Sequence, residues 1–174
     1  MHHFLTTNQT EPPFVSALAY SLMMALLLLS VYASIKYHKN PSFIKSMKIL
    51  QLCQLAVLYS WYVGFQLPLA NSLPLYHCRL AMFAVVFLPD KWPSKQYFAL
   101  LGASGAVFAL GYPVFDPYDF PHITSFSFLI GHYALLVNSL IYLMNHYDKT
   151  QLKKYMIVLY TFVLDAFLVG VNQV

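Results

Sequence analysis

Charged side chains are scarce in this 174-residue sequence. Asp, Glu, Lys and Arg together make up 9% of it, whereas 59% of the residues are hydrophobic. A soluble domain averages about 25% charged residues, so this chain has too few to coat a globule of its size. The shortage excludes a disordered chain, a secreted disulfide scaffold and a soluble nucleic-acid-binding protein, and it favours lipid as the main solvent.

Cysteine and recognisable catalytic motifs are also scarce. The two cysteines, Cys53 and Cys78, lie in apolar stretches 25 residues apart, which excludes a CxxC zinc site. Residues 1–13 contain no Lys or Arg, so the basic start of a signal peptide is missing and we expect the first apolar run to be retained. No GxSxG, Walker A, GxGxxG or paired-carboxylate motif is present, and we expect neither a cofactor nor a bound metal.

Long apolar runs are what the sequence does contain. A membrane helix needs about 20 mostly apolar residues, and six runs meet or approach that length: 14–36, 44–65, 74–88, 96–115, 124–144 and 155–174. We therefore predict an all-α protein, a polytopic membrane helix bundle of six transmembrane helices. A polar N-terminal segment, 1–13, precedes this single domain, 14–174.

The basic residues are unevenly distributed over the connections between these runs. Nine of the ten Lys and Arg residues lie in or beside the first, third and fifth connections, and none lies in the second or fourth. Basic connections stay on the cytoplasmic side, so we predict both termini on the outside. The isoelectric point of about 9.0 then reflects orientation against anionic lipid rather than binding of nucleic acid.

Local patterns add detail to the predicted helices. Asn40 followed by Pro41 is typical of a helix start, with a capping side chain before a first-turn proline. In the second run, Gln51 and Gln54 are expected to bond between helices, with Cys53 as a packing residue. Small residues in the fourth run predict a face for close helix packing: Gly102, Ser104, Gly105 and Ala109.

Arg79 and Asp165 are ionisable residues that the charge pattern leaves unexplained. Arg79 lies about one turn into the third run and Asp165 near the middle of the sixth. Such groups are costly in a membrane and are usually paired or functional. Arg79 either extends to outer headgroups or binds an anionic group such as a lipid phosphate. An Arg79–Asp165 pair is also expected, with a structural or a catalytic role, whereas Asp116 and Asp119 are interpreted as solvated loop charges.

Three histidines and a cysteine complete the polar set near the predicted outer surface. His77 begins the third run, His122 lies in the fourth connection and His132 lies two turns into the fifth run. Their spacing matches no helical metal motif. His132 is a candidate base for Cys78 as a nucleophile, while His77, being adjacent to Cys78, faces elsewhere on a regular helix. The alternative is that Cys78 is a small buried apolar residue.

Two blocks of the sequence carry a family resemblance. The segment LPLYHC at residues 73–78 resembles the LPLHLC segment of the YwaF family of bacterial integral membrane proteins, and residues 111–132 resemble that family's TPD…FPH…FFxxH block. The family is similar to the eukaryotic transmembrane protein 164 group, described as a phospholipid acyltransferase that uses a Cys and a His. The resemblance covers most of residues 42–174. It implies a multi-pass protein of the bacterial plasma membrane, with Cys78 as acyl acceptor and His132 as base.

These observations predict a lipid-directed acyltransferase with its site in the outer half of the bilayer. The predicted catalytic residues are Cys78, His132 and His77, and the predicted substrate-binding residues are Arg79, His122 and Asp165. Two alternatives remain open: a small-molecule-binding subunit of a transporter, which needs a partner to supply energy, and a structural subunit of a membrane complex. Membrane lipid is the expected partner, a membrane protein is a further candidate, and nucleic acid is not expected.

Overall fold

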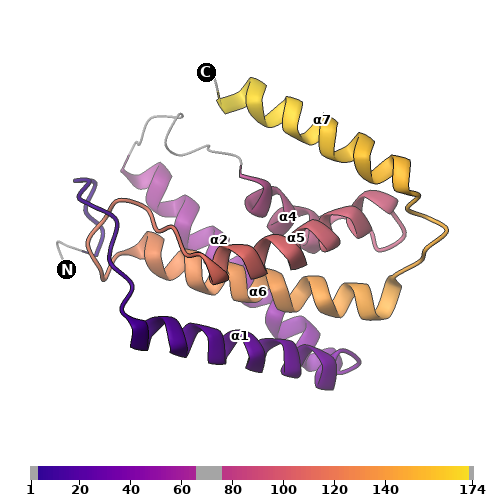
Figure 1. Cartoon of the computed structure of the whole chain (residues 1–174), viewed down its shortest axis with the longest axis horizontal. Coiled ribbons are helices and arrows are strands. Elements are labelled where there is room, and N and C mark those ends of the chain that lie inside the picture. Colours follow the sequence, from indigo (N-terminus) through magenta and orange to yellow (C-terminus); the bar gives the residue numbers. More distant parts are fainter. Residues whose placement is uncertain (1–3, 66–75, 173–174) are drawn as a thin grey trace.

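The computed structural model describes residues 4–65 and 76–172 of the chain. Across these residues all regular structure is helical, as predicted (Figure 1). The helices are α1 (Ala17–Tyr37), α2 (Pro41–Gly64), α4 (His77–Phe87), α5 (Pro93–Gly111), α6 (Ile123–His146) and α7 (Lys154–Asn172). Each coincides with one of the six apolar runs, so the all-α prediction is confirmed.

The membrane-spanning character of these helices is less uniform than their number suggests. In the described part of the chain, α1 and α6 are both long and apolar enough to cross a membrane. Helix α4 has 11 residues, or about 16 Å at 1.5 Å per residue, which is shorter than the ~30 Å hydrocarbon core. The structure thus supports a helix at each of the six predicted places. Two of these helices, α1 and α6, are both long enough and apolar enough to span a membrane.

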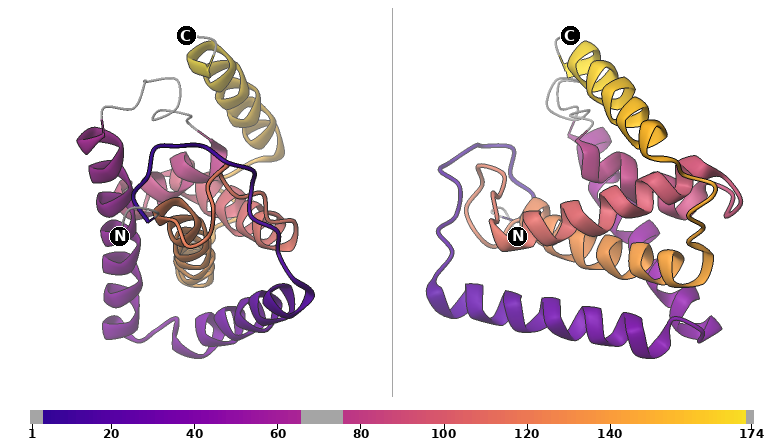
Figure 2. Two further views of the ribbon diagram at one scale, coloured as in Figure 1. Left: turned by 90° about the vertical axis from the view of Figure 1, so that its left-hand side faces the viewer. Right: turned by 45° about the vertical axis from the view of Figure 1, so that its right-hand side comes forward.

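Helix α6 lies at the centre of the bundle. It packs against α1, α2, α4 and α5, and the left view of Figure 2 shows it end-on with these helices around it. Leu135 and Leu136 on α6 are fully buried and join the main apolar core. Helix α7 stands apart from this core and packs chiefly along α5, through a small cluster that includes Tyr97 and Leu164.

Small residues allow α5 and α6 to approach closely. A Cβ atom added at Gly102 would lie 2.7 Å from Oγ of Ser139 and 2.8 Å from Cδ1 of Leu135. Gly105 faces α4 instead, whereas Ser104 is exposed and donates its hydroxyl back to its own helix. The predicted small-residue face is therefore confirmed at the two glycines and wrong at Ser104.

The start of α2 is capped as the sequence predicts. The Asn40 side-chain oxygen accepts hydrogen bonds from the backbone N–H groups of Ser42, at 3.0 Å, and Phe43, at 3.2 Å. Pro41 occupies the first helical position, where its missing N–H costs little. This cap fixes the point at which the chain turns from α1 into α2.

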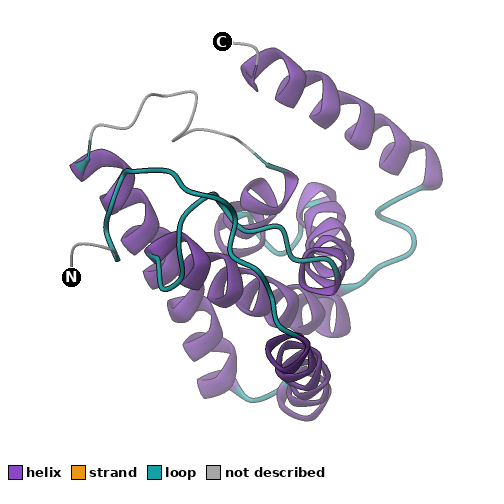
Figure 3. Cartoon of the chain, turned by 60° about the vertical axis from the view of Figure 1, so that its left-hand side comes forward, coloured by secondary structure: helices purple, strands orange, loops and turns teal. Residues whose placement is uncertain are grey.

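The polar N-terminal segment closes one end of the bundle, where loops cross one another in Figure 3. The Thr10 N–H donates to the Pro117 carbonyl at 2.8 Å, and the Ile123 N–H donates to the Phe4 carbonyl at 3.1 Å. The indole of Trp61 donates to the carbonyl of Leu5 at 3.3 Å. Residues 4–10 are thus hydrogen-bonded to the end of α2 and to the loop between α5 and α6.

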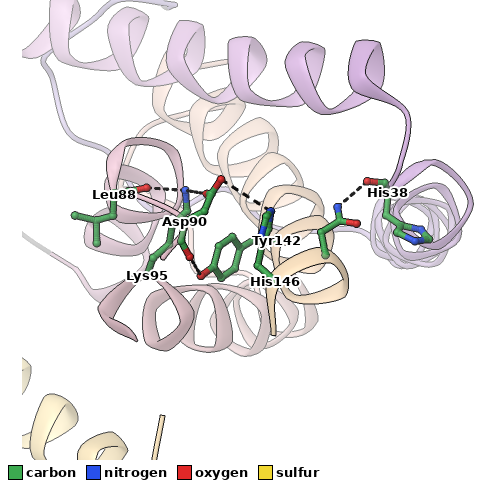
Figure 4. Close-up of polar contacts among 7 residues, drawn as sticks. His38, Leu88, Asp90, Lys95, Tyr142 and His146 are labelled. Carbon is green, nitrogen blue, oxygen red and sulfur yellow. Dashed lines mark hydrogen bonds and ion pairs between the residues drawn. The ribbon is translucent and has the colours of Figure 1, made fainter. Parts of the chain in front are cut away.

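The opposite end is held by a polar cluster between the α4–α5 loop and α6 (Figure 4). The Lys95 ammonium is buried and donates to the Leu88 carbonyl and to Oδ1 of Asp90, both at 2.7 Å. The Tyr142 hydroxyl donates to the Asp90 carbonyl at 2.8 Å, and Nε2 of His146 lies 3.9 Å from Oδ2 of Asp90. Lys95 is therefore a packed structural cation, a role that the distribution of basic residues along the sequence does not predict.

Candidate functional site

A cavity of about 590 Å³ lies between α2, the start of α4, α6 and the loop that precedes α6. It is at the end of the bundle that the N-terminal segment closes. Its polar lining residues are Gln54, Tyr76, His77, Cys78, Arg79, Asp116, Thr124, Ser127 and His132, and its apolar lining residues are Leu55, Leu58, Met82, Val114, Phe115, Pro117 and Phe128. The cavity thus combines one polar wall with space for an apolar chain, and we call it the α2–α4–α6 cavity.

Cys78 reaches this cavity from the first turn of α4. Its thiol is partly buried, and Sγ packs against α5 at Gly105, 3.3 Å from the position that a Cβ would take there. In the described residues no hydrogen bond joins Cys78 to His132, although both side chains line the cavity. The other cysteine, Cys53, is exposed, so the prediction that it packs inside the bundle is wrong.

His132 reaches the cavity from α6 with a defined tautomer. Its ring is 9% exposed, and Nδ1 lies 2.7 Å from the carbonyl oxygen of Phe128. A carbonyl only accepts, so Nδ1 must carry the proton, and the neutral ring has its lone pair on Nε2. The Phe128 ring also packs on the imidazole, with 4.4 Å between centroids. The hydrogen bond and the packing together orient a basic nitrogen of His132.

Arg79 is held by tyrosines rather than by a carboxylate. Its Nη2 donates to the hydroxyl of Tyr62 at 2.8 Å, and its guanidinium lies 5.3 Å from the Tyr62 ring centre and 5.8 Å from that of Tyr76. Its Nη1 is buried and has no hydrogen-bond partner among the described residues. The predicted Arg79–Asp165 pair is wrong, because Asp165 binds a different residue.

Asp165 instead binds His77, which lies at the mouth of the cavity. Nε2 of His77 donates to Oδ1 of Asp165 at 2.7 Å, and the two side chains are 45% and 53% exposed. His77 lines the cavity, whereas Asp165 contacts it only through His77. The pair links the first turn of α4 to the middle of α7.

His122, the third predicted histidine, does not line the cavity. It is fully buried at the N-terminus of α6, where Nε2 donates to the Thr6 carbonyl at 3.1 Å and Nδ1 faces the Thr124 hydroxyl at 2.9 Å. Its ring stacks on Tyr118, with 4.1 Å between centroids. Burial lowers the pKa of His122, although the bond to Thr6 and the charge of Asp116 oppose that effect. The structure gives His122 a capping position with both ring nitrogens occupied.

Several lining residues escaped sequence reasoning. Asp116 is half-buried and lines the cavity, a position that its interpretation as a solvated loop charge does not include. Gln54 donates across the α2–α6 contact to Ser127, which confirms the predicted bonding between helices for this residue, whereas Gln51 donates to Gln54 within α2. Thr124, Phe128 and His132 follow one another at intervals of four residues and so share one face of α6, and this helical spacing is the signal that could have identified this wall.

The donor set does not resemble a metal centre. No group of three His, Cys, Asp or Glu side chains lies close enough to hold a metal ion within residues 4–65 and 76–172. The reactive and charged groups that line the cavity are a thiol, two oriented imidazoles, a guanidinium and the carboxylate of Asp116.

Comparison with known proteins identifies the family. The family model described as the TMEM164 family matches residues 4–174, nearly the whole chain and all of the cavity-lining residues. No curated protein and no solved structure matches the chain. Family membership and the two long apolar helices both favour a membrane protein. By the extent of this match, the chain belongs to the TMEM164 family.

Proposed function

We propose that the chain is a multi-pass plasma-membrane protein that transfers acyl groups between lipids in the α2–α4–α6 cavity. The observation that carries the proposal is the presence of three chemically matched groups in one cavity. These are the thiol of Cys78, Nε2 of His132 and Nη1 of Arg79, and neither nitrogen has a hydrogen-bond partner among the residues that the structure describes. Resemblance to a lipid acyltransferase group supports the same function.

The outer surface of the bundle supports contact with lipid. On α1, Leu18, Leu22 and Leu28 are 72%, 62% and 68% exposed, and on α7, Val158 and Phe162 are 70% and 72% exposed. Apolar surface of this extent is not stable against water. We therefore propose that all six segments lie in the membrane, with lipid as the direct partner of α1 and α7.

The two ends of the bundle support an orientation. Asp90 of the α4–α5 loop, Lys95 at the start of α5 and His146 at the end of α6 gather at one end. At the same end the side chain of Asn145 donates to the carbonyl of His38, at the end of α1. The N-terminal segment and the loop before α6 gather at the other. Basic connections stay in the cytoplasm, so the cavity would open on the outer side and both termini would lie there.

The proposed chemistry divides acyl transfer into two steps. Nε2 of His132 takes the thiol proton of Cys78, and the sulfur attacks the carbonyl carbon of the donor ester. The carbon–oxygen bond breaks, the departing alcohol takes the proton, and a thioester remains on Cys78. The first turn of α4 presents N–H groups and a positive dipole end, which favour the negative charge that develops on the carbonyl oxygen.

Arg79 would supply the binding of the lipid headgroup. A buried guanidinium nitrogen without a partner costs about 1–3 kcal/mol, and a phosphate oxygen would satisfy it. Planar guanidinium groups match phosphate geometry. The apolar lining residues, among them Leu58, Met82 and Phe128, then provide the space for the acyl chain.

A reconstituted assay tests the proposal. The purified chain in phosphatidylcholine vesicles with a labelled acyl chain, supplied with lysophospholipid, should yield labelled diacyl product. Cys78→Ser should abolish the product, and Cys53→Ser is the matched control that should retain it, because Cys53 is exposed and outside the cavity. Undiminished transfer by Cys78→Ser would rule out the thiol mechanism.

A further inference from the structure

The cavity contains a second oriented imidazole that the thiol mechanism above does not use. His77 and Cys78 occupy the first two positions of α4, and both line the cavity. Neighbouring side chains on a helix diverge, so His77 is poorly placed to take the proton of Cys78. A different group in the cavity, the substrate, is its natural proton partner.

The hydrogen bond to Asp165 defines what His77 can do. A carboxylate accepts, so the 2.7 Å contact fixes the proton of His77 on Nε2 and leaves the lone pair on Nδ1. His132 has the opposite arrangement, with Nδ1 bonded to the Phe128 carbonyl and the lone pair on Nε2. The cavity therefore holds two bases on different helices, each with one ring nitrogen fixed by an acceptor.

Transfer of an acyl group between two alcohols through a thioester includes two deprotonation steps, and a different base can serve each step. The first half-reaction moves a proton from the thiol to the departing alcohol, and the second must remove a proton from the incoming hydroxyl. Resting on the proposed function, we propose that His77 is the base for the incoming acceptor hydroxyl and that Asp165 is its positioning residue. The acceptor class is a lipid alcohol such as a lysophospholipid.

The proposed second half-reaction balances without a further reactant. The acceptor hydroxyl gives its proton to Nδ1 of His77, and its oxygen attacks the thioester carbonyl on Cys78. The carbon–sulfur bond breaks and a new ester bond forms. The thiolate takes up a proton from water, and His77, about half exposed at the cavity mouth, returns its proton to water.

The location of Asp165 gives α7 a part in the site. Helix α7 meets the remaining described helices through few contacts, one of which is the hydrogen bond between Tyr97 and Thr161 at 3.0 Å. The hydrogen bond between Asp165 and His77 joins this helix to the cavity. Figure 1 shows α7 lying along one side of the bundle, above α5. A carboxylate delivered by this helix can orient His77 without occupying the volume that the substrate needs.

Separate measurement of the two half-reactions tests the inference in the full chain in vesicles. Acylation is measured as hydroxylamine-labile label on Cys78 from labelled phosphatidylcholine without acceptor, and transfer as loss of that label after lysophospholipid is added. Asp165→Asn offers His77 an amide that can donate to Nε2 and shift the proton to Nδ1. This variant should acylate normally but transfer about 10- to 100-fold more slowly, because positioned acid–base groups contribute about 10²–10⁴-fold.

Two control variants separate positioning from docking of α7. Asp165→Glu keeps the carboxylate and should restore most of the transfer rate. Thr161→Val removes the hydrogen bond between α7 and Tyr97 of α5 and should change neither half-reaction. Equal transfer rates in Asp165→Asn and the unaltered chain overturn the inference alone, as does parallel loss of both half-reactions in Asp165→Asn and Thr161→Val. Absence of any label on Cys78 in the unaltered chain overturns the proposed function and the inference together.

Discussion

Replacing Gly102 with alanine is expected to loosen the packing of α5 on α6. The new methyl carbon would lie 2.7 Å from Oγ of Ser139 and 2.8 Å from Cδ1 of Leu135, about 1 Å closer than the ~3.5–4.0 Å of a good carbon contact. Both neighbours are fully buried, so neither can move into solvent. Overpacking of this kind costs about 1–3 kcal/mol, and alanine returns at most about 1 kcal/mol through helix propensity.

The net destabilisation should therefore be about 1 kcal/mol, which corresponds to a fall of about 2–4 °C in the unfolding midpoint for a chain of this size. The assay is thermal unfolding of the purified chain in one detergent. Gly111→Ala is the matched control, because a Cβ at this other α5 glycine meets no atom within 4 Å, and its midpoint should be unchanged or slightly higher.

A double variant tests the cause of the change. Leu135→Ala alone should cost about 2–5 kcal/mol through the space that it leaves. Combined with Gly102→Ala it should cost less than the sum, with a coupling of about 0.5–3 kcal/mol, since the added methyl fills part of that space. A Gly102→Ala chain as stable as Gly111→Ala, or strictly additive costs, would refute the steric explanation.

Three further predictions follow from the polar contacts. The pKa of His122 is lowered in the folded chain, so neutral His122 stabilises the fold above its ordinary pKa, and this stabilisation is lost as the pH falls. His122→Asn can still cap α6 and should reduce the drop in unfolding midpoint between pH 7.5 and 5.5. Partial burial alone would raise the pKa of Asp90, but the hydrogen bond and charge of Lys95 lower it overall. Asp90→Asn should therefore lower the midpoint at pH 7, and its difference from the unaltered chain should shrink as the pH falls through that lowered pKa. Arg79→Lys keeps the charge but loses the planar group, so in the reconstituted assay the KM for lysophospholipid should rise about tenfold with a smaller change in kcat.

The helices were predictable because their signals are local. Apolar runs identify the segments, and the Asn40-Pro41 cap begins α2 at the expected turn. Helix α4 is shorter than its predicted run, starting at His77; the start of that run, 74–75, lies outside the described residues. The central position of α6 was not predictable, because all six runs are similarly apolar and the sequence does not state which one the others surround.

The sequence predicts which residues line the cavity better than it predicts which of these residues bond to one another. Cys78, Arg79, His77 and His132 do share a cavity, since a polar residue inside an apolar run is a strong local signal. The predicted Arg79–Asp165 pair is wrong because opposite charge alone does not determine which side chains meet. Rotation about the helix axes turns Arg79 toward Tyr62, and one phenol among 14 tyrosines carries no signal of that role.

The surroundings of His122 depend on a contact between residues far apart in the sequence, which local sequence patterns do not predict. Its position in a polar connection suggested substrate binding, yet the structure buries it under the N-terminal segment, where it donates to the carbonyl of Thr6. The two residues are 116 positions apart. Nothing in the neighbourhood of His122 in the sequence indicates that the first residues of the chain will cover it.

That N-terminal contact also constrains the order in which the protein can be made. Phe4 and Thr10 leave the ribosome long before their partners, Ile123 and Pro117, so these two hydrogen bonds can form only after the helices described between them, α1, α2, α4 and α5, have been synthesised. The segment can therefore join the loop that lines the cavity at Phe115, Asp116 and Pro117 only after that loop has been made, which makes this contact a late event in folding. A bulky fusion at the N-terminus would act on this late contact, delaying the joining of the segment to the loop while leaving the earlier helices to form normally.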